Sequence, residues 1–150
     1  MAPKFSLQNV LDVRHGRVEL LEVELGKLMV AQQQVELQLS TLYEVHKNLL
    51  DELEIVQSDD IDLVKSGMLR LNLSQVNSYI KSLALELEKR KWEVEGKRVE
   101  LVKAKQAEET LEILKRKRHE VYLAEQIQSE TRMQDDIYIA RAFRNQQQGV

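Results

Sequence analysis

Apolar residues recur along the first part of the chain at alternating steps of four and three residues. The series starts at Leu7 and ends at Val56, and polar side chains occupy only Arg14, Gln32 and His46. The other members of this first seam are Leu11, Val18, Leu21, Leu25, Leu28, Val35, Leu39, Leu42, Leu49 and Leu53. An average repeat of 3.5 residues is typical of a helix that packs against another helix in a coiled coil. The pattern therefore predicts a helix over about residues 4–57.

The periodic pattern is interrupted after the first seam by residues that favour helix ends. Ser58 precedes the acidic pair Asp59-Asp60, and such side chains commonly cap the first turn of a helix. The dipeptide Ser66-Gly67 offers a second interruption shortly afterwards. We therefore expect a turn at about residues 58–68.

A second seam follows the expected turn with the same four-three spacing. Its apolar members are Leu69, Leu73, Val76, Ile80, Leu83, Leu87, Val94 and Leu101. Arg90 and Lys97 interrupt it as polar residues, and a second helix is expected over about residues 69–146. Beyond about residue 102 the spacing drifts, and Leu111, Leu114 and Val121 require a shifted register.

The two expected helices differ in length, which bears on the fold. Folding the chain antiparallel about position 63 leaves about 25 residues of the second helix without a partner, or roughly 35–40 Å. Proline occurs once, at position 3, and no alternating run of β-branched and polar residues indicates a strand. We predict an all-α fold, a long antiparallel two-helix coiled-coil hairpin with a C-terminal helix overhang, in a single domain over residues 1–150.

The distribution of charge agrees with a hairpin. Residues 1–60 carry 5 Lys and Arg against 11 Asp and Glu, whereas residues 61–150 carry 17 against 14. An acidic first arm and a basic second arm attract each other when the chain folds back. The net charge of −3 is too small to indicate a nucleic acid or a membrane surface as the partner.

The chain also lacks the sequence features of several functional classes. It contains no cysteine, which excludes disulfides and thiolate metal sites. No signal peptide and no long apolar span is apparent, so we expect a soluble, cytoplasmic protein with no membrane insertion. The acidic pairs Asp59-Asp60 and Asp135-Asp136 lack the spaced ligands of a calcium loop. We expect no catalytic residue, no cofactor and no metal site, and hence a binding protein rather than an enzyme.

A basic run from Lys115 to Arg118 raises nucleic-acid binding as an alternative function, since clustered cations neutralise phosphates. Glutamates such as Glu112 and Glu120 interleave with it, and the nearby Tyr122 offers no platform for stacked bases. A solvated helix face is therefore favoured, followed by a docking surface for an acidic protein partner.

Both ends of the chain resemble one protein family. The start, Phe5 to Arg14, reads FSLQNVLDVR and resembles the Phe-x-Leu-x-x-(Leu/Val)-Leu-Asp-x-Arg opening of the FliJ family of flagellar export proteins. The finish, Gln134 to Arg144, reads QDDIYIARAFR and is similar to the acidic-pair, Ala and Arg-rich ending of that family. The resemblance implies a soluble component of the type III export apparatus with a coiled coil similar to the central stalk of rotary ATPases.

The resemblance also implies partners. The terminal end would insert into the pore of the hexameric export ATPase and promote its assembly and activity. The hairpin end would contact the cytoplasmic domain of the export gate protein, at the cytoplasmic face of the apparatus. Some members of the family also escort export chaperones. An injectisome-type secretion stalk and a motor-independent coiled-coil scaffold or chaperone escort are the alternatives.

Two sets of contact residues follow from the resemblance. The expected ATPase contacts are Phe5, Leu7, Arg14, Tyr138, Arg141, Phe143 and Arg144. The expected export-gate contacts are Gln38, Leu42, Val45, Leu49, Tyr79, Leu83, Glu86 and Arg90. The gate contacts form two quartets with four-three-four spacing, so each quartet shares one face of its helix. Leu42, Leu49 and Leu83 are also seam positions, for which packing between the helices is an alternative role.

Overall fold

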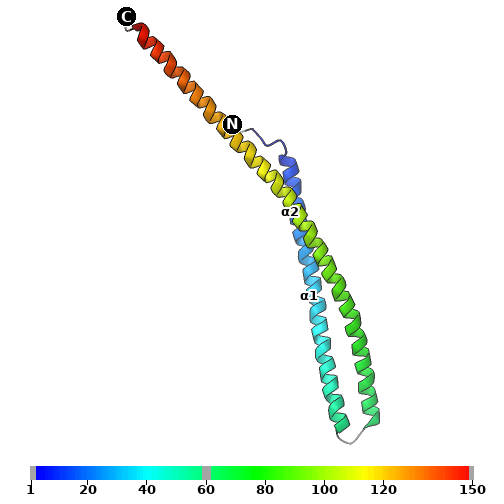
Figure 1. Cartoon of the computed structure of the whole chain (residues 1–150). Helices are drawn as coiled ribbons and strands as arrows, with labels where there is room; N and C mark the ends of the chain where they lie inside the picture. The colour runs from blue at the N-terminus through cyan, green and yellow to red at the C-terminus, as the bar shows by residue number, and fades with distance from the viewer. Residues whose placement is uncertain (1–2, 59–61, 149–150) are drawn as a thin grey trace. The chain divides into compact units, whose positions relative to one another are not determined.

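The computed structural model describes residues 3–58 and 62–148, and it is helical over nearly all of them. Helix α1 spans Gln8–Ser58 and helix α2 spans Leu63–Gln148 (Figure 1). No strand occurs in these two described ranges. The predicted all-α helical hairpin is confirmed, while part of the expected turn, residues 59–61, lies outside the described residues.

Helix α2 starts at Leu63, before the expected start at 69, because Asp62 caps its first turn. One carboxylate oxygen of Asp62 accepts hydrogen bonds from the backbone N–H groups of Val64 and Lys65, both at 3.1 Å. Ser66 is buried and Gly67 continues the helix without a positive φ. A good cap stabilises a helix by about 1 kcal/mol, which is about as much as an interior glycine destabilises it. Ser66-Gly67 is therefore part of the helix and not a break in it.

The chain forms two compact units, each built from both helices. Unit 1 comprises residues 1–17 and 104–150, and unit 2 comprises residues 18–103. The expectation that the whole chain is one domain stays a prediction.

The core of unit 2 consists of the two predicted seams. Every first-seam position from Val18 to Val56 is buried or partly buried, and Leu21 is only 2% exposed. The other buried apolar residues of the unit are Val18, Val35, Leu39, Leu69, Leu73, Val94 and Leu101. Burying a Leu or Val side chain contributes roughly 1.5–3 kcal/mol, so this narrow seam holds the two helices together.

Three polar seam positions in unit 2, Gln32, Arg90 and Lys97, are occupied by side chains with charged partners. Lys97 Nζ lies 3.0 Å from a carboxylate oxygen of Glu24 on α1 and 3.3 Å from one of Glu100. The hydrogen bond with Glu24, together with the contact with Glu100, raises the pKa of Lys97 above its ordinary value, although partial burial opposes the shift. The seam therefore tolerates this lysine because a carboxylate from the facing helix compensates its charge.

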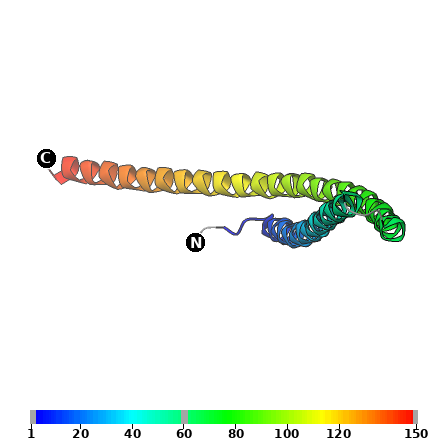
Figure 2. The same cartoon turned by 90° about the horizontal axis from the view of Figure 1, so that it is seen from below.

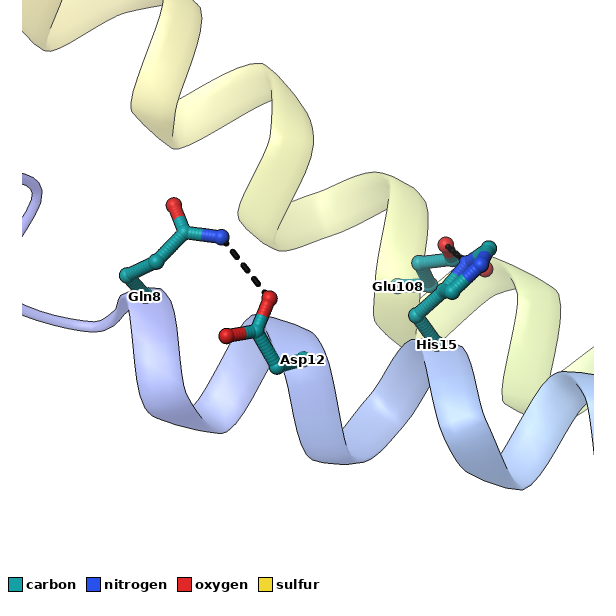
Figure 3. A network of polar contacts seen from close by, with 4 residues as sticks. All are labelled: Gln8, Asp12, His15 and Glu108. Carbon is teal, nitrogen blue, oxygen red and sulfur yellow. Dashed lines mark hydrogen bonds and ion pairs between the residues drawn. The ribbon is translucent and has the colours of Figure 1, made fainter.

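In unit 1 the start of α1 packs against a later part of α2. Leu11 and Leu111 are buried, and Arg14 Nη1 donates a hydrogen bond of 2.8 Å to the backbone carbonyl of Ala107. His15 pairs with Glu108 across the two helices, and Gln8 Nε2 donates a hydrogen bond of 2.9 Å to a carboxylate oxygen of Asp12 along α1 (Figure 3). Polar contacts thus fix the register of the helices in this unit.

The expected register shift beyond residue 102 is wrong for Leu111 and Val121 but agrees with Leu114, which is partly buried while Lys115, the next position of the unshifted spacing, is exposed. Ala104, Glu108 and Leu111 keep the four-three spacing and are buried or partly buried, whereas Val121 is 56% exposed. The seam continues through a small residue and through a glutamate that is paired with His15. A search for large apolar residues alone overlooks both kinds of seam position.

The predicted overhang is present in unit 1. Tyr122 is the last partly buried residue of α2, and every residue from 123 to 148 is exposed. At about 1.5 Å per residue this single helix is roughly 40 Å long. Figure 2 shows α2 continuing alone past the start of α1.

Candidate protein-binding surfaces

A shallow apolar groove lies between the two helices of unit 2. It encloses about 500 Å³ and is lined by Leu37, Gln38, Thr41, Leu42, Tyr79 and Leu83. Leu42 and Leu83 are partly buried seam residues, and Leu37 and Tyr79 are 68% and 64% exposed. The seam thus supplies the floor and the exposed side chains supply the walls. Such a surface suits an apolar side chain of another protein.

Four of the eight expected gate contacts line this apolar groove, namely Gln38, Leu42, Tyr79 and Leu83. The other four do not line it. Val45 is exposed and Leu49 is partly buried, while Arg90 lies 3.6 Å from a carboxylate oxygen of Glu86 in an ion pair along α2. The structure therefore brings half of the set together, and the role of all eight in gate binding stays a prediction.

Sequence reasoning missed two residues of the apolar groove, Leu37 and Thr41. Both lie outside the first seam, so a seam search passes over them. Leu37 precedes Gln38 by one position and Thr41 precedes Leu42 by one position. Leu37 and Thr41 are four residues apart and thus share one face of α1 next to the seam, and this spacing could have indicated them. Thr41 Oγ1 donates its hydrogen bond, at 3.0 Å, to the carbonyl of Leu37, which leaves its methyl group for the groove.

The expected ATPase contacts in the first arm take part in the packing of unit 1. Phe5 is partly buried, and the guanidinium carbon of Arg118 lies 5.4 Å from the centre of its ring. Arg118 also donates a hydrogen bond of 2.9 Å to the hydroxyl of Ser6. Leu7 is partly buried, and Arg14 is bonded to the backbone of α2. These three side chains therefore have structural partners within the chain.

The expected ATPase contacts in α2 lie on the overhang instead. Tyr138 is 74% exposed and Phe143 is 60% exposed, and Arg141 and Arg144 are exposed as well. Because Phe5 lies against Arg118, about 30 Å of helix separates it from Tyr138. The structure thus divides the expected set into a packed group and an exposed group.

Cations gather around Phe5, and two of them, Lys115 and Arg118, belong to the basic run noted in the sequence. A hollow of about 90 Å³ is lined by Pro3, Lys4, Phe5, Lys115, Arg118, His119 and Tyr122. The rings of His119 and Tyr122 are stacked with their centres 6.5 Å apart, so Tyr122 already has an aromatic neighbour. Binding of an acidic ligand here stays a prediction, as does the absence of nucleic-acid binding.

Other kinds of site are not apparent in the described parts of the chain. Residues 3–58 and 62–148 contain no group of three or more His, Asp or Glu side chains placed to hold a metal ion. Neither of the two helices, over its described length, has a segment apolar enough to cross a membrane.

Two long helices that pack against each other define the class, an all-α coiled-coil protein. The family described as "Flagellar FliJ protein" matches residues 3–148, nearly the whole chain. The chain belongs to the FliJ family and is thereby a component of flagellar protein export, a non-catalytic role in that family. Neither a curated protein nor a solved structure gives a significant match.

Proposed function

We propose that this chain is a stalk-like component of the flagellar export apparatus whose overhang docks in the pore of the hexameric export ATPase. In that position it promotes assembly and activity of the ATPase. The overhang supports this proposal by its size, because one helix of about 10–12 Å diameter and roughly 40 Å length can enter a ring.

The observation that carries the proposal is the arrangement of apolar side chains around the overhang. Ile137, Tyr138 and Ile139 follow one another and are 50%, 74% and 63% exposed. At 100° per residue these three side chains point to different sides of α2, and Phe143 points about 140° away from Tyr138. A single partner helix covers one stripe, whereas a surrounding pore covers all sides. The arrangement therefore favours an enclosing partner.

We also propose that the apolar groove contacts the cytoplasmic domain of the export gate protein, which would link the ATPase to the gate. The groove supports this by its apolar lining and by four of the expected contact residues. A protein with these two contacts would work at the cytoplasmic face of the apparatus. Escort of export chaperones would use surfaces that remain accessible outside these contacts.

ATP hydrolysis by the cognate export ATPase tests the docking proposal. We expect the intact chain to raise turnover as its concentration increases, and a chain truncated after Arg132 to lose this effect. The double variant Tyr138→Ala, Phe143→Ala should lose most of it, and Gln146→Ala serves as the matched control near the same end. If the truncated chain still stimulates the ATPase, docking by the overhang is refuted. If the intact chain does not stimulate an ATPase that assembles normally, a motor-independent scaffold is favoured.

Binding to the isolated cytoplasmic gate domain tests the role of the groove. Leu37→Ala and Tyr79→Ala should each weaken binding at least tenfold in titration calorimetry, because both remove an exposed wall of the groove. Leu20→Ala is the matched control, since Leu20 is 54% exposed on α1 and does not line the groove. Equal effects of all three substitutions would refute this surface.

A further inference from the structure

The side of α2 that faces away from α1 in unit 2 carries large apolar residues. Val64, Leu71, Leu85 and Trp92 are 74%, 62%, 75% and 76% exposed, and Val99 is 46% exposed. Their spacing is a multiple of seven residues, so they share one side of the helix. We call these five residues the outer stripe. Leu71 lies two residues from both Leu69 and Leu73, which places the stripe opposite the seam.

Packing within the hairpin does not explain this stripe. Positions opposite a coiled-coil seam face water and are normally polar. Gly96 lies on the same side, between Trp92 and Val99, and a Cβ atom built there would meet no atom within 4 Å. Glycine weakens the interior of a helix, and no contact within the chain requires it here. A second helix approaching closely at this point would require it.

We propose that the outer stripe binds the outer stripe of a second copy of this chain, in an antiparallel arrangement. The twofold axis passes between Lys81 and Ser82, because the stripe is symmetric about that point. Leu71 then faces Trp92 of the second copy, and Ser78 faces Leu85. Gly96 faces Gly67 of the second copy, and a Cβ atom built at either glycine would meet no atom within 4 Å of its own chain. The small residues at Gly67, Ser78 and Gly96 thus leave room for the two helices to approach, while Leu71 and Trp92 supply the apolar contact.

The surface around Ser78 fits this arrangement. A shallow hollow of about 420 Å³ is lined by Arg70, Leu73, Ser74, Asn77, Ser78 and Lys81. It exists because the serines and the asparagine are short side chains. Leu85 of the second copy would fill it, since Leu85 is opposite Ser78 in the proposed register.

The charges beside the outer stripe select the antiparallel orientation. All carboxylates on its two flanks lie in its second half, at Glu86, Glu88, Glu93, Glu95 and Glu100. The flanks of the second half also carry Lys89, Lys91 and Arg98, so five carboxylates and three cations leave them with a net charge of −2. The flanks of the first half contain no carboxylate and carry Lys65, Arg70 and Lys81, a net charge of +3, and antiparallel pairing places the two opposite charges side by side.

The area of the stripe sets the expected strength of the dimer. Its aliphatic side chains offer roughly 80–100 Å² each and Trp92 about 150 Å², which gives roughly 500 Å² of apolar surface per copy. A stable interface buries about 800 Å² per partner, and the polar flanks supply the difference only in part. We therefore expect a reversible dimer with a dissociation constant of about 1–100 µM. The outer stripe lies within unit 2, so the proposal does not depend on docking by the overhang.

Sedimentation velocity of the full chain at about 1–300 µM tests this inference. The mass should double over this range, and the emission of Trp92, the only tryptophan, should shift to shorter wavelength in parallel. Leu85→Glu should weaken the dimer at least tenfold. A chain that stays monomeric over the whole range, or a dimer that Leu85→Glu leaves unchanged, would overturn the proposal.

A second variant separates loss of the interface from loss of folding. Gly96→Gln places a good helix former in α2, so the monomer should become more resistant to urea while the dimer weakens at least tenfold. Gly26→Gln is the matched control, because Gly26 is also an interior glycine with free space around it, on α1. Equal dimerisation of the two variants would contradict close approach at Gly96.

A cysteine placed at the expected axis tests the register. The chain contains no cysteine, so Ser82→Cys introduces a single thiol that should form a disulfide between copies under mild oxidation. Ser74→Cys is the control, because two such thiols would lie about 20 Å apart along the antiparallel pair. Equal cross-linking at both positions would refute the proposed register.

Discussion

Leu21→Ala is the most direct test of the seam in unit 2. Leu21 is 2% exposed, so truncation removes contacts that are almost completely shielded from water. Leu→Ala substitutions in cores cost about 2–5 kcal/mol, depending on how far the site collapses. A two-helix seam is open on both sides and can collapse partly, so we expect about 2.5–3.5 kcal/mol.

The neighbouring residue provides the control for this substitution. Leu20 is 54% exposed, so Leu20→Ala removes less than half as much buried surface and should cost at most about 1 kcal/mol. Both substitutions have the same effect on intrinsic helix propensity, and their difference therefore reports burial.

Urea unfolding followed by circular dichroism at 222 nm measures both variants. With a slope of about 2 kcal/mol per molar urea, Leu21→Ala should lower the midpoint by about 1.5 M and Leu20→Ala by no more than about 0.5 M. Equal shifts, or a larger shift for Leu20→Ala, would refute the assignment of Leu21 to the core.

Three further predictions concern the ends and charges of the helices. Asp62→Ala should lower the free energy of unfolding by about 0.5–2 kcal/mol in the same urea assay, because it removes the cap of α2, and no change would contradict the early start of that helix. The raised pKa of Lys97 means that its contribution to stability is complete below the pKa of the unfolded chain and is lost as the pH rises through the higher folded pKa. Unfolding measured at increasing alkaline pH should therefore show a smaller loss of stability in Lys97→Met than in the unchanged chain, and a parallel loss would argue against the pair with Glu24. Amide hydrogen exchange should be faster over residues 123–148 than at Leu21 or Leu73, because an uncovered helix opens easily, and protection equal to that of the seam would mean that the isolated chain covers its overhang.

Much of the fold could be predicted from the sequence because the residues that pack between the helices of a coiled coil recur in a short repeat. The prediction identified every member of the first seam, including the polar ones, because apolar neighbours four and three residues away fix the position of each polar residue in the repeat. The start of α2 was not predictable from residue types alone, because Asp59, Asp60 and Asp62 are all suitable caps. Only the geometry identifies Asp62 as the residue that accepts the two backbone hydrogen bonds.

The candidate surfaces were predictable to different degrees. Exposure of Tyr138 and Phe143 followed from helix lengths, whereas the packing of Phe5 under Arg118 depends on which residues meet across unit 1. The outer stripe obeys the same repeat as the seam, displaced to the opposite side of α2. The seven-residue spacing of Leu85, Trp92 and Val99 could have indicated it, but a search for the strongest seam assigns these residues to the solvent side.

The energetics of the overhang show why its arginines matter for the proposed docking. Seven large apolar side chains between residues 123 and 148 are exposed, each by roughly half to three quarters. Their burial would contribute about 6–12 kcal/mol, while association itself costs an estimated 4–15 kcal/mol. Apolar contact therefore roughly offsets the cost of binding, and charged hydrogen bonds must supply most of the net affinity.

Arg141 and Arg144 are the exposed cations best placed to supply that affinity, because they lie beside Tyr138 and Phe143. A hydrogen bond to a charged group contributes about 1.5–3 kcal/mol, so Arg141→Ala and Arg144→Ala should each weaken binding to the export ATPase about 10- to 150-fold. Arg132→Ala is the control, since Arg132 lies on the same exposed helix ahead of this cluster. Affinity measured by surface plasmon resonance should also fall with salt in the unchanged chain and less steeply in either variant. If Arg132→Ala weakens binding as much as the other two, the arginines act only through overall charge, and the terminal cluster does not define the contact.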